Sequence, residues 1–222
     1  MLSRKLLAEG VGTAFLLMTI IGSGIMGDNL ANQQPGDTLT PQSIITGAML
    51  FVLIALMGPV SGAHFNPAVT MVFALRRELS LSEASAYVVV QVIAAISGVW
   101  LAHVMFGVDI GQLSATPRTG VNLWIAEIIA TAGLILVILG GLRINPALIP
   151  ALVGLYIMSA YWFTASTSFA NPAVTIARTL SDSFSGIFPG HAPAYIAAQI
   201  LGALLGWWLA SKLYPEDGNE GA

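Results

Sequence analysis

Few side chains in this sequence could do chemistry, and most of them lie in apolar surroundings. Glu9 and Glu127 each fall inside a long apolar run, where a carboxylate is by default a functional candidate, for instance as a proton relay. The three histidines are far apart and the chain has no cysteine, so neither a metal site nor a thiol nucleophile is expected. Ser166, Thr167 and Ser168 have no neighbouring base and acid. We therefore predict no enzyme and no cofactor.

A second polar feature is the word Asn-Pro-Ala-Val-Thr, which occurs at 66–70 and again at 171–175. Asn is a preferred N-cap and Pro is preferred at the first helical position, so each word predicts an abrupt helix start. The helical pattern that follows lasts about ten residues, whereas a spanning helix needs about 20. Because lipid cannot bond to free N–H groups, such a short helix must be buried in protein or line a wet cavity.

The composition indicates that lipid is the solvent for most of the chain. Of its 222 residues, 56% are hydrophobic and 9% are charged, while a soluble domain carries about 25% charged residues. The net charge is −3 and no basic patch is found, so no nucleic-acid partner is expected. The six segments that we expect to span the bilayer are Leu6–Met26, Gln42–Val60, Ala84–Phe106, Leu123–Leu142, Ala147–Phe163 and Pro193–Leu213.

The two halves of the chain match at more than this word. "AEGVGTAFLL" (8–17) resembles "AEIIATAGLI" (126–135), and "YVVVQVIAAISG" (87–98) resembles "YIAAQILGALLG" (195–206). A single membrane domain is expected over 1–222, with one repeat over about 1–112 and the other over about 118–222. Each repeat holds an odd number of spans, so the second enters the membrane from the opposite side, and the functional site should lie near the midplane. A duplication without a shared site is the alternative.

The basic residues predict the orientation of the chain. With both termini in the cytoplasm, most of the cations face inward, as the positive-inside rule requires, and only Arg118 and Arg178 fall outside. The inward set is Arg4, Lys5, Arg76, Arg77, Arg143 and Lys212. We therefore expect a multi-pass protein of the inner (plasma) membrane.

In an inverted repeat the two short helices meet at their N-terminal ends, each of which carries about half a positive charge. Such ends repel cations, while the amides of Asn66 and Asn171 remain as donors to a passing neutral oxygen. The pattern thus predicts a pore for small uncharged molecules.

With these features the chain resembles the aquaporin, or major intrinsic protein, family. The resemblance rests on Asn66, Pro67 and Ala68, on Asn171, Pro172 and Ala173, and on the paired glutamates and glutamines. It implies an all-α membrane protein with six transmembrane helices and two re-entrant half-helices in an inverted repeat. It also implies a homotetramer in the lipid bilayer, with a water-conducting pore in every subunit.

The resemblance assigns supporting roles to several polar residues. It implies that Glu9 and Glu127 accept hydrogen bonds from the backbone that leads into the half-helices. His64 is expected to pack in its loop beside the cytoplasmic mouth, and Gln91 and Gln199 to bind loop backbone or lie at helix contacts. The alternative for the glutamates is a proton relay, and for His64 a role as solute ligand.

The selectivity filter departs from the pattern of the family. Most members have Arg directly after the second Asn-Pro-Ala, but here Val174 stands there. Ungapped alignment places the other filter positions at Thr46, Ser159 and Ser168, a small, neutral set without an aromatic ring. The resemblance therefore implies a wide, uncharged constriction that passes glycerol, urea or metalloid acids such as arsenous acid (arsenite) besides water.

Arg178 lies one helical turn after Val174 and shares its face. We expect it at the pore mouth or in an ion pair with Asp182, and a substitute filter role is the alternative. The predicted function is a passive channel for water and small uncharged solutes. The alternative is an ion- or proton-coupled secondary transporter of a small polar solute, with Glu9 and Glu127 as coupling groups.

Overall fold

The computed structural model describes residues 2–30 and 35–215, and every regular element within them is a helix. In this part of the chain six helical segments are long and apolar enough to cross a membrane, which confirms the predicted spans. They are α1 (Leu2–Leu30), α2 (Pro35–Ser61), α4 (Leu81–Phe106), α5 (Val121–Ile144), α6 (Ile149–Phe163) preceded by the turn η1 (Pro146–Leu148), and α8 (Ala192–Leu213) preceded by η2 (Pro189–His191).

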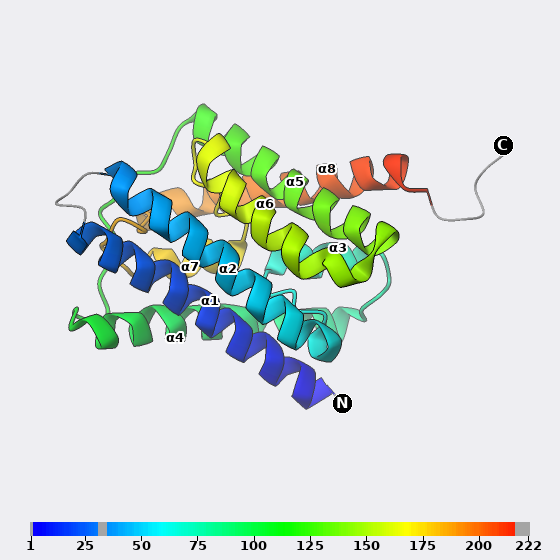
Figure 1. Ribbon diagram of the computed structural model, residues 1–222, viewed down its shortest axis with the longest axis horizontal. Coiled ribbons are helices and arrows are strands. Elements are labelled where there is room, and N and C mark those ends of the chain that lie inside the picture. The colour runs from blue at the N-terminus through cyan, green and yellow to red at the C-terminus, as the bar shows by residue number, and fades with distance from the viewer. Residues whose placement is uncertain (1, 31–34, 216–222) are drawn as a thin grey trace.

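The spanning helices run roughly along one axis, so the start of α1 and the end of α8 lie at the same end of the bundle (Figure 1). We call this the terminal end, and the opposite one the loop end. The segments 107–120 and 179–191 lie at the loop end and are joined by hydrogen bonds, among them Ser114 N to Thr179 O at 2.9 Å and Phe188 N to Thr116 O at 2.7 Å.

Two short helices complete the bundle, and both begin at the repeated word. They are α3 (Pro67–Leu75) and α7 (Pro172–Arg178). Asn66 and Asn171 are their N-caps, with extended backbone, and a proline follows each of them at the first helical position. In Figure 1, α3 lies toward the terminal end and α7 toward the loop end, with the spanning helices around them.

Small residues let the spanning helices approach closely, in the same way in both halves. A Cβ added to Gly98 of α4 would lie 2.4 Å from the carbonyl oxygen of Ala14 in α1, and one added to Gly206 of α8 would lie 2.3 Å from that of Ala132 in α5. The sequence alignment of the halves pairs these four residues. Close backbone contact at small residues is how helices associate where lipid supplies no hydrophobic driving force.

Replacing Gly206 by alanine should destabilise the bundle, because the new methyl group would clash with the backbone of α5, which cannot move away as a flexible side chain could. Overpacking of this kind costs roughly 1–3 kcal/mol, so the unfolding midpoint of Gly206→Ala in a detergent titration should fall. Gly58→Ala is the matched control, since a Cβ at Gly58 in α2 meets nothing within 4 Å. Equal midpoints for the two variants would contradict this account of the α5–α8 contact.

Candidate functional site

Each half-helix is reached through a loop whose backbone N–H groups point at a buried carboxylate. Glu9 in α1 accepts hydrogen bonds from His64 N at 2.9 Å and from Phe65 N at 2.7 Å. Glu127 in α5 accepts them from the next loop, at 2.9 Å from both Phe169 N and Ala170 N. Both carboxylates are fully buried. They therefore hold the loops in place, and neither belongs to the wall of the central cavity described below.

The backbone of both loops is held in an unusual conformation at matching places. Ala63 and Phe65 have φ of 51° and 49°, and the corresponding Ser168 and Ala170 have φ of 51° and 46°. Non-glycine residues rarely adopt this left-handed region, and they persist there only when the surroundings over-determine it. The hydrogen bonds to the glutamates provide that constraint.

The two glutamines complete the same network. Gln91 Nε2 donates to Glu9 Oε2 at 2.8 Å and to Thr70 Oγ1 at 3.0 Å. In the other half, Gln199 Nε2 donates to Glu127 Oε2 at 2.6 Å and to the threonine that ends the second repeated word, Thr175, at 2.8 Å. The glutamines thus join each carboxylate to its half-helix rather than bonding to loop backbone.

The two asparagines of the repeated word bond across the molecule to each other's loops. Asn66 Nδ2 donates to the carbonyl of Ala170, and Asn171 Nδ2 donates to that of Phe65, both at 2.8 Å. Each Oδ1 accepts from its own helix, at 2.9 Å from Ala68 N and from Ala173 N respectively. An amide nitrogen carries two hydrogens, so each Asn keeps one donor for a solute.

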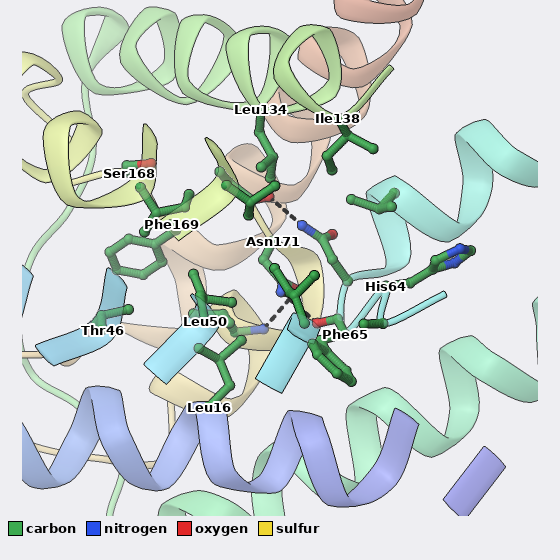
Figure 2. A pocket seen from close by; sticks show the side chains of 18 of the residues that line it. Leu16, Thr46, Leu50, His64, Phe65, Leu134, Ile138, Ser168, Phe169 and Asn171 are labelled. Carbon is green, nitrogen blue, oxygen red and sulfur yellow. Dashed lines mark hydrogen bonds between the residues drawn. The ribbon is translucent and has the colours of Figure 1, made fainter. Parts of the chain in front are cut away.

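A cavity of about 160 Å³ passes these asparagines. Thr46, Ser168 and Phe169 lie at one end of it, His64 lies at the other, and Asn171 lies between them (Figure 2). His64 packs against the rings of Phe73 and Tyr87, and its Nδ1 lies 3.1 Å from Thr70 Oγ1. The histidine is therefore both a loop-packing residue and part of the cavity wall.

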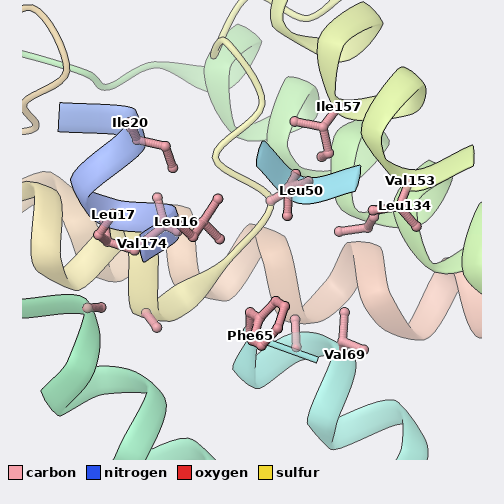
Figure 3. Close-up of a cluster of buried hydrophobic side chains, with 14 of the residues drawn as sticks. Leu16, Leu17, Ile20, Leu50, Phe65, Val69, Leu134, Val153, Ile157 and Val174 are labelled. Atoms are coloured by element: carbon pink, nitrogen blue, oxygen red, sulfur yellow. The ribbon is translucent and has the colours of Figure 1, made fainter. Parts of the chain in front are cut away.

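The wall of this cavity is apolar on the helices and polar along the loops. Its aliphatic part is shared by α1, α2, α5 and α6 and includes Leu16, Ile20, Leu50, Leu134, Val153 and Ile157, with Val69 and Val174 from the half-helices (Figure 3). Residues 62–65 and 168–170 supply the polar strip. Among the described residues, nothing donates to the carbonyls of residues 62–64 and 168–169. These oxygens are free to accept hydrogen bonds from a solute.

Three of the four expected filter residues line the cavity: Thr46, Ser168 and Val174. The expectation for Ser159 is corrected. Its side chain is exposed on α6, where it bonds to Leu155 O at 2.8 Å. Two residues correspond to about 200° of helical rotation, so Tyr161 faces the cavity instead and donates to Thr46 Oγ1 at 3.4 Å.

Arg178 also lies in the cavity wall, and only 1% of it is exposed. Its Nε donates to the carbonyl of Ser185, and its guanidinium lies 3.5 Å from the centre of the Phe169 ring. The expected partner Asp182 is exposed and accepts instead from Ala115 N at 2.9 Å. Arg178, Tyr161 and Phe169 therefore correct the expectation of a wall without charge or aromatic rings.

Arg118 in the segment 107–120 holds the neighbouring loop. Its Nε donates to Gly186 O at 2.8 Å and its Nη2 to Phe184 O at 3.0 Å. Burial lowers the pKa of this guanidinium from its usual value. Two backbone carbonyls thus accept hydrogen bonds from this buried charge.

The residues that sequence reasoning missed are Thr70, Thr175, Tyr161 and Phe169. The threonines carried a signal, because they are the last letter of both copies of the repeated word. The aromatic residues carried none, since one apolar residue at the end of a span looks like any other. Within the described residues no group of His, Asp or Glu could hold a metal ion, and the polar strip can bind and pass a solute but has no arrangement for bond making.

Comparisons with known proteins agree with this geometry. A family model described as "Major intrinsic protein" matches residues 1–163. The chain is 49% identical over 183 residues to "Aquaglyceroporin AqpS" of Rhizobium meliloti (strain 1021), covering 82% of this chain and 78% of that protein. It is 37% identical over 139 residues to "Nodulin-26" of Glycine max, covering 62% and 50%. The X-ray structure of the aquaglyceroporin from Plasmodium falciparum superposes with a TM-score of 0.74 at 20% identity, over 96% and 97% of the chains.

Replacing Glu127 by glutamine should loosen the second loop. A carboxylate offers acceptors on both oxygens, whereas the amide of glutamine would set a donor against the N–H of Phe169 or Ala170 or against the amide of Gln199. Losing a hydrogen bond to a charged acceptor costs on the order of 2 kcal/mol. We expect Glu127→Gln to lower the unfolding midpoint in detergent and to reduce water permeability in vesicles.

The control for this variant is Glu78→Gln. Glu78 is exposed and pairs with Arg76 at 2.5 Å, and exposed ion pairs contribute about 0–1 kcal/mol. A Glu127→Gln variant as stable and as permeable as Glu78→Gln would show that the carboxylate does not hold the loop.

Proposed function

Because this chain belongs to the major intrinsic protein family, we propose that it is a passive channel for water and small uncharged solutes, wide at Val174. It is a multi-pass membrane channel and not an enzyme. The polar strip of free carbonyls and the two spare asparagine donors give a solute both acceptors and donors along the cavity. An uncharged molecule can exchange its hydration for these groups at little cost.

The observation that carries the proposal is the short aliphatic side chain of Val174 in the cavity wall. Val174 lies in the first turn of α7, close to Asn171, and its N–H lies 3.3 Å from Asn171 Oδ1. A longer cationic side chain at this place would narrow the passage and hinder solutes larger than water. Valine leaves room, so glycerol, urea and trihydroxy metalloid acids such as arsenous acid become substrates.

The relative from Rhizobium meliloti is named an aquaglyceroporin, which supports solutes larger than water for this chain as well. Glycerol and arsenous acid share the features that the cavity recognises, namely neutral charge and several hydroxyl groups. The hydroxyls can donate to the free loop carbonyls while their carbon or arsenic framework lies against the aliphatic wall.

The geometry gives no support to a proton-coupled transporter. The oxygens of Glu9 and Glu127 are occupied by donors from the loops and the glutamines, and neither residue lines the cavity. A coupling group must exchange its proton with the transport path. Here protonation would instead release the loop that shapes the path.

The family also supports a homotetramer and cytoplasmic termini for this chain. Large apolar side chains lie on the outer surface, including Leu56 of α2, which is 66% exposed, and Val104 of α4, which is 65% exposed. Lipid or a second copy of the chain can cover them. Native mass spectrometry in detergent tests the tetramer, and protease access in oriented vesicles tests the side on which the termini lie.

Stopped-flow light scattering on proteoliposomes tests the function directly. We expect water, glycerol and arsenous acid each to move down its own gradient, with the same rates whether or not a proton gradient is present. Solute flux that requires the proton gradient would overturn the channel, and water flux without glycerol or arsenous acid flux would overturn the wide passage.

Enlarging the side chain at Val174 should close the channel to larger solutes first. We expect Val174→Phe and Val174→Arg to lower glycerol permeability about tenfold, equivalent to about 1.4 kcal/mol of barrier, and water permeability much less. Val89→Phe is the matched control, because Val89 is 57% exposed on α4, away from the cavity. Equal losses of water and glycerol flux in the Val174 variants would place the constriction elsewhere.

A further inference from the structure

Arg178 is a buried cation, and no carboxylate in the described part of the chain forms an ion pair with it. In the described residues the ion pairs join Lys5 to Glu83 and Arg76 to Glu78, and neither involves Arg178. Its only protein hydrogen bond in this part of the chain is from Nε to Ser185 O. A guanidinium has five N–H donors, so both Nη groups remain without protein partners in the cavity wall to which Arg178 belongs.

Burying a charge in this position is energetically costly, and this cost suggests that the charge has a function. Removing a cation from water without a counter-ion is unfavourable, and the residue could be neutral or apolar if it served packing alone. An ionisable residue at membrane depth that faces a cavity is therefore a candidate functional group. The free Nη groups of Arg178 can be solvated only by what occupies the cavity, which is water or solute.

The surrounding structure fixes this guanidinium rigidly. The Phe169 ring lies beneath it at 3.5 Å and attracts the cation through its π face. Ser185, which supplies the accepting carbonyl, is itself anchored, since its Oγ accepts from Gln42 Nε2 at 2.5 Å and donates to Ile20 O at 3.2 Å. Gln42 therefore acts as a positioning residue that joins α1 and α2 to the loop holding Arg178.

Arg178 lies one turn from Val174 along α7, about 5.4 Å toward the loop end. A solute that enters from the loop end meets the guanidinium before it reaches the valine. Solutes are thereby selected at two places along the same face of α7. Arg178 selects by charge and hydrogen bonding, and Val174 selects by size.

We propose that Arg178 is the specificity-determining cation of this channel, which donates hydrogen bonds to neutral solute oxygens and repels cations one turn outside Val174. The inference rests on the proposed channel function. It differs from a purely structural role, in which Arg178 would only brace Ser185. A structural brace affects stability, whereas a charge in the passage affects the ratio of ion flux to water flux.

Proteoliposomes carrying Arg178→Met test the inference through sodium and proton flux, read by dyes inside the vesicles and normalised to water flux. Removing a unit charge close to the path changes the electrostatic barrier to a cation by enough to raise this ratio on the order of tenfold or more. Arg178→Lys keeps the charge and should keep cations excluded. Arg77→Met is the matched control, because Arg77 is an exposed arginine just after α3, the other half-helix.

A second variant tests whether position or charge matters. In Val174→Arg combined with Arg178→Met the cation moves one turn inward, and we expect the exclusion of sodium and protons to return. Arg178→Met with water flux and unchanged cation exclusion would overturn the inference, as would an Arg178→Lys channel that leaks as much as Arg178→Met. Water and glycerol flux in the unchanged protein tests the channel function separately, so the two failures are distinguishable.

If Arg178→Met does not fold, the unchanged protein still decides the question. 2,3-Butanedione, a small uncharged reagent for guanidinium groups, should modify Arg178 through the cavity and raise cation flux, and glycerol should slow the modification. Peptide mass spectrometry identifies the modified residue. A water-conducting channel in which Arg178 stays unmodified, or in which its modification leaves cation flux unchanged, would overturn the inference.

Discussion

The structure depends on one requirement, that the backbone of two re-entrant loops finds its hydrogen-bond partners inside the protein. Lipid offers none, and an unpaired N–H group at that depth costs several kcal/mol. Glu9 and Glu127 meet the requirement by accepting two successive N–H groups each. A buried carboxylate is itself costly, but donors from the loop and from a glutamine compensate for its lost hydration. Each apolar span can therefore carry an acid without using it for proton transfer.

This arrangement determines what the cavity presents to a solute. Because the loop N–H groups bond outward to the glutamates, the carbonyls of residues 62–64 and 168–169 accept no hydrogen bond from any described residue. The crossed bonds from Asn66 to Ala170 and from Asn171 to Phe65 then tie the two half-helices into one unit. A polar strip faces an aliphatic wall along the whole passage. A solute with hydroxyl groups and no charge can bond to the strip while its framework lies against the wall, and this is the physical basis for proposing glycerol as well as water.

Most of the scaffold could be predicted because the two halves of the sequence repeat the same pattern. The repeated word, the paired glutamates and the paired glutamines mark equivalent places in the two halves, and the spans follow from length and hydropathy. The residues that differ between the halves could not be placed in this way. The prediction of Ser159 rests on an ungapped alignment through α6, where an error of two residues turns a side chain to the opposite face. Tyr161 and Phe169 look apolar in sequence and acquire their roles only through three-dimensional neighbours.

The surroundings of Arg178 could not be predicted from the sequence either. Its burial depends on the return path of residues 179–188, which brings the carbonyl of Ser185 and, through Arg118, a rigid loop against it. No local pattern encodes that path. The partners it supplies are a carbonyl dipole and an aromatic face, and neither neutralises the cation as a carboxylate would. The positive field therefore stays in the passage. In the two proposals taken together, valine at position 174 gives the channel its width and Arg178 keeps its charge, so that larger neutral solutes enter while ions are opposed.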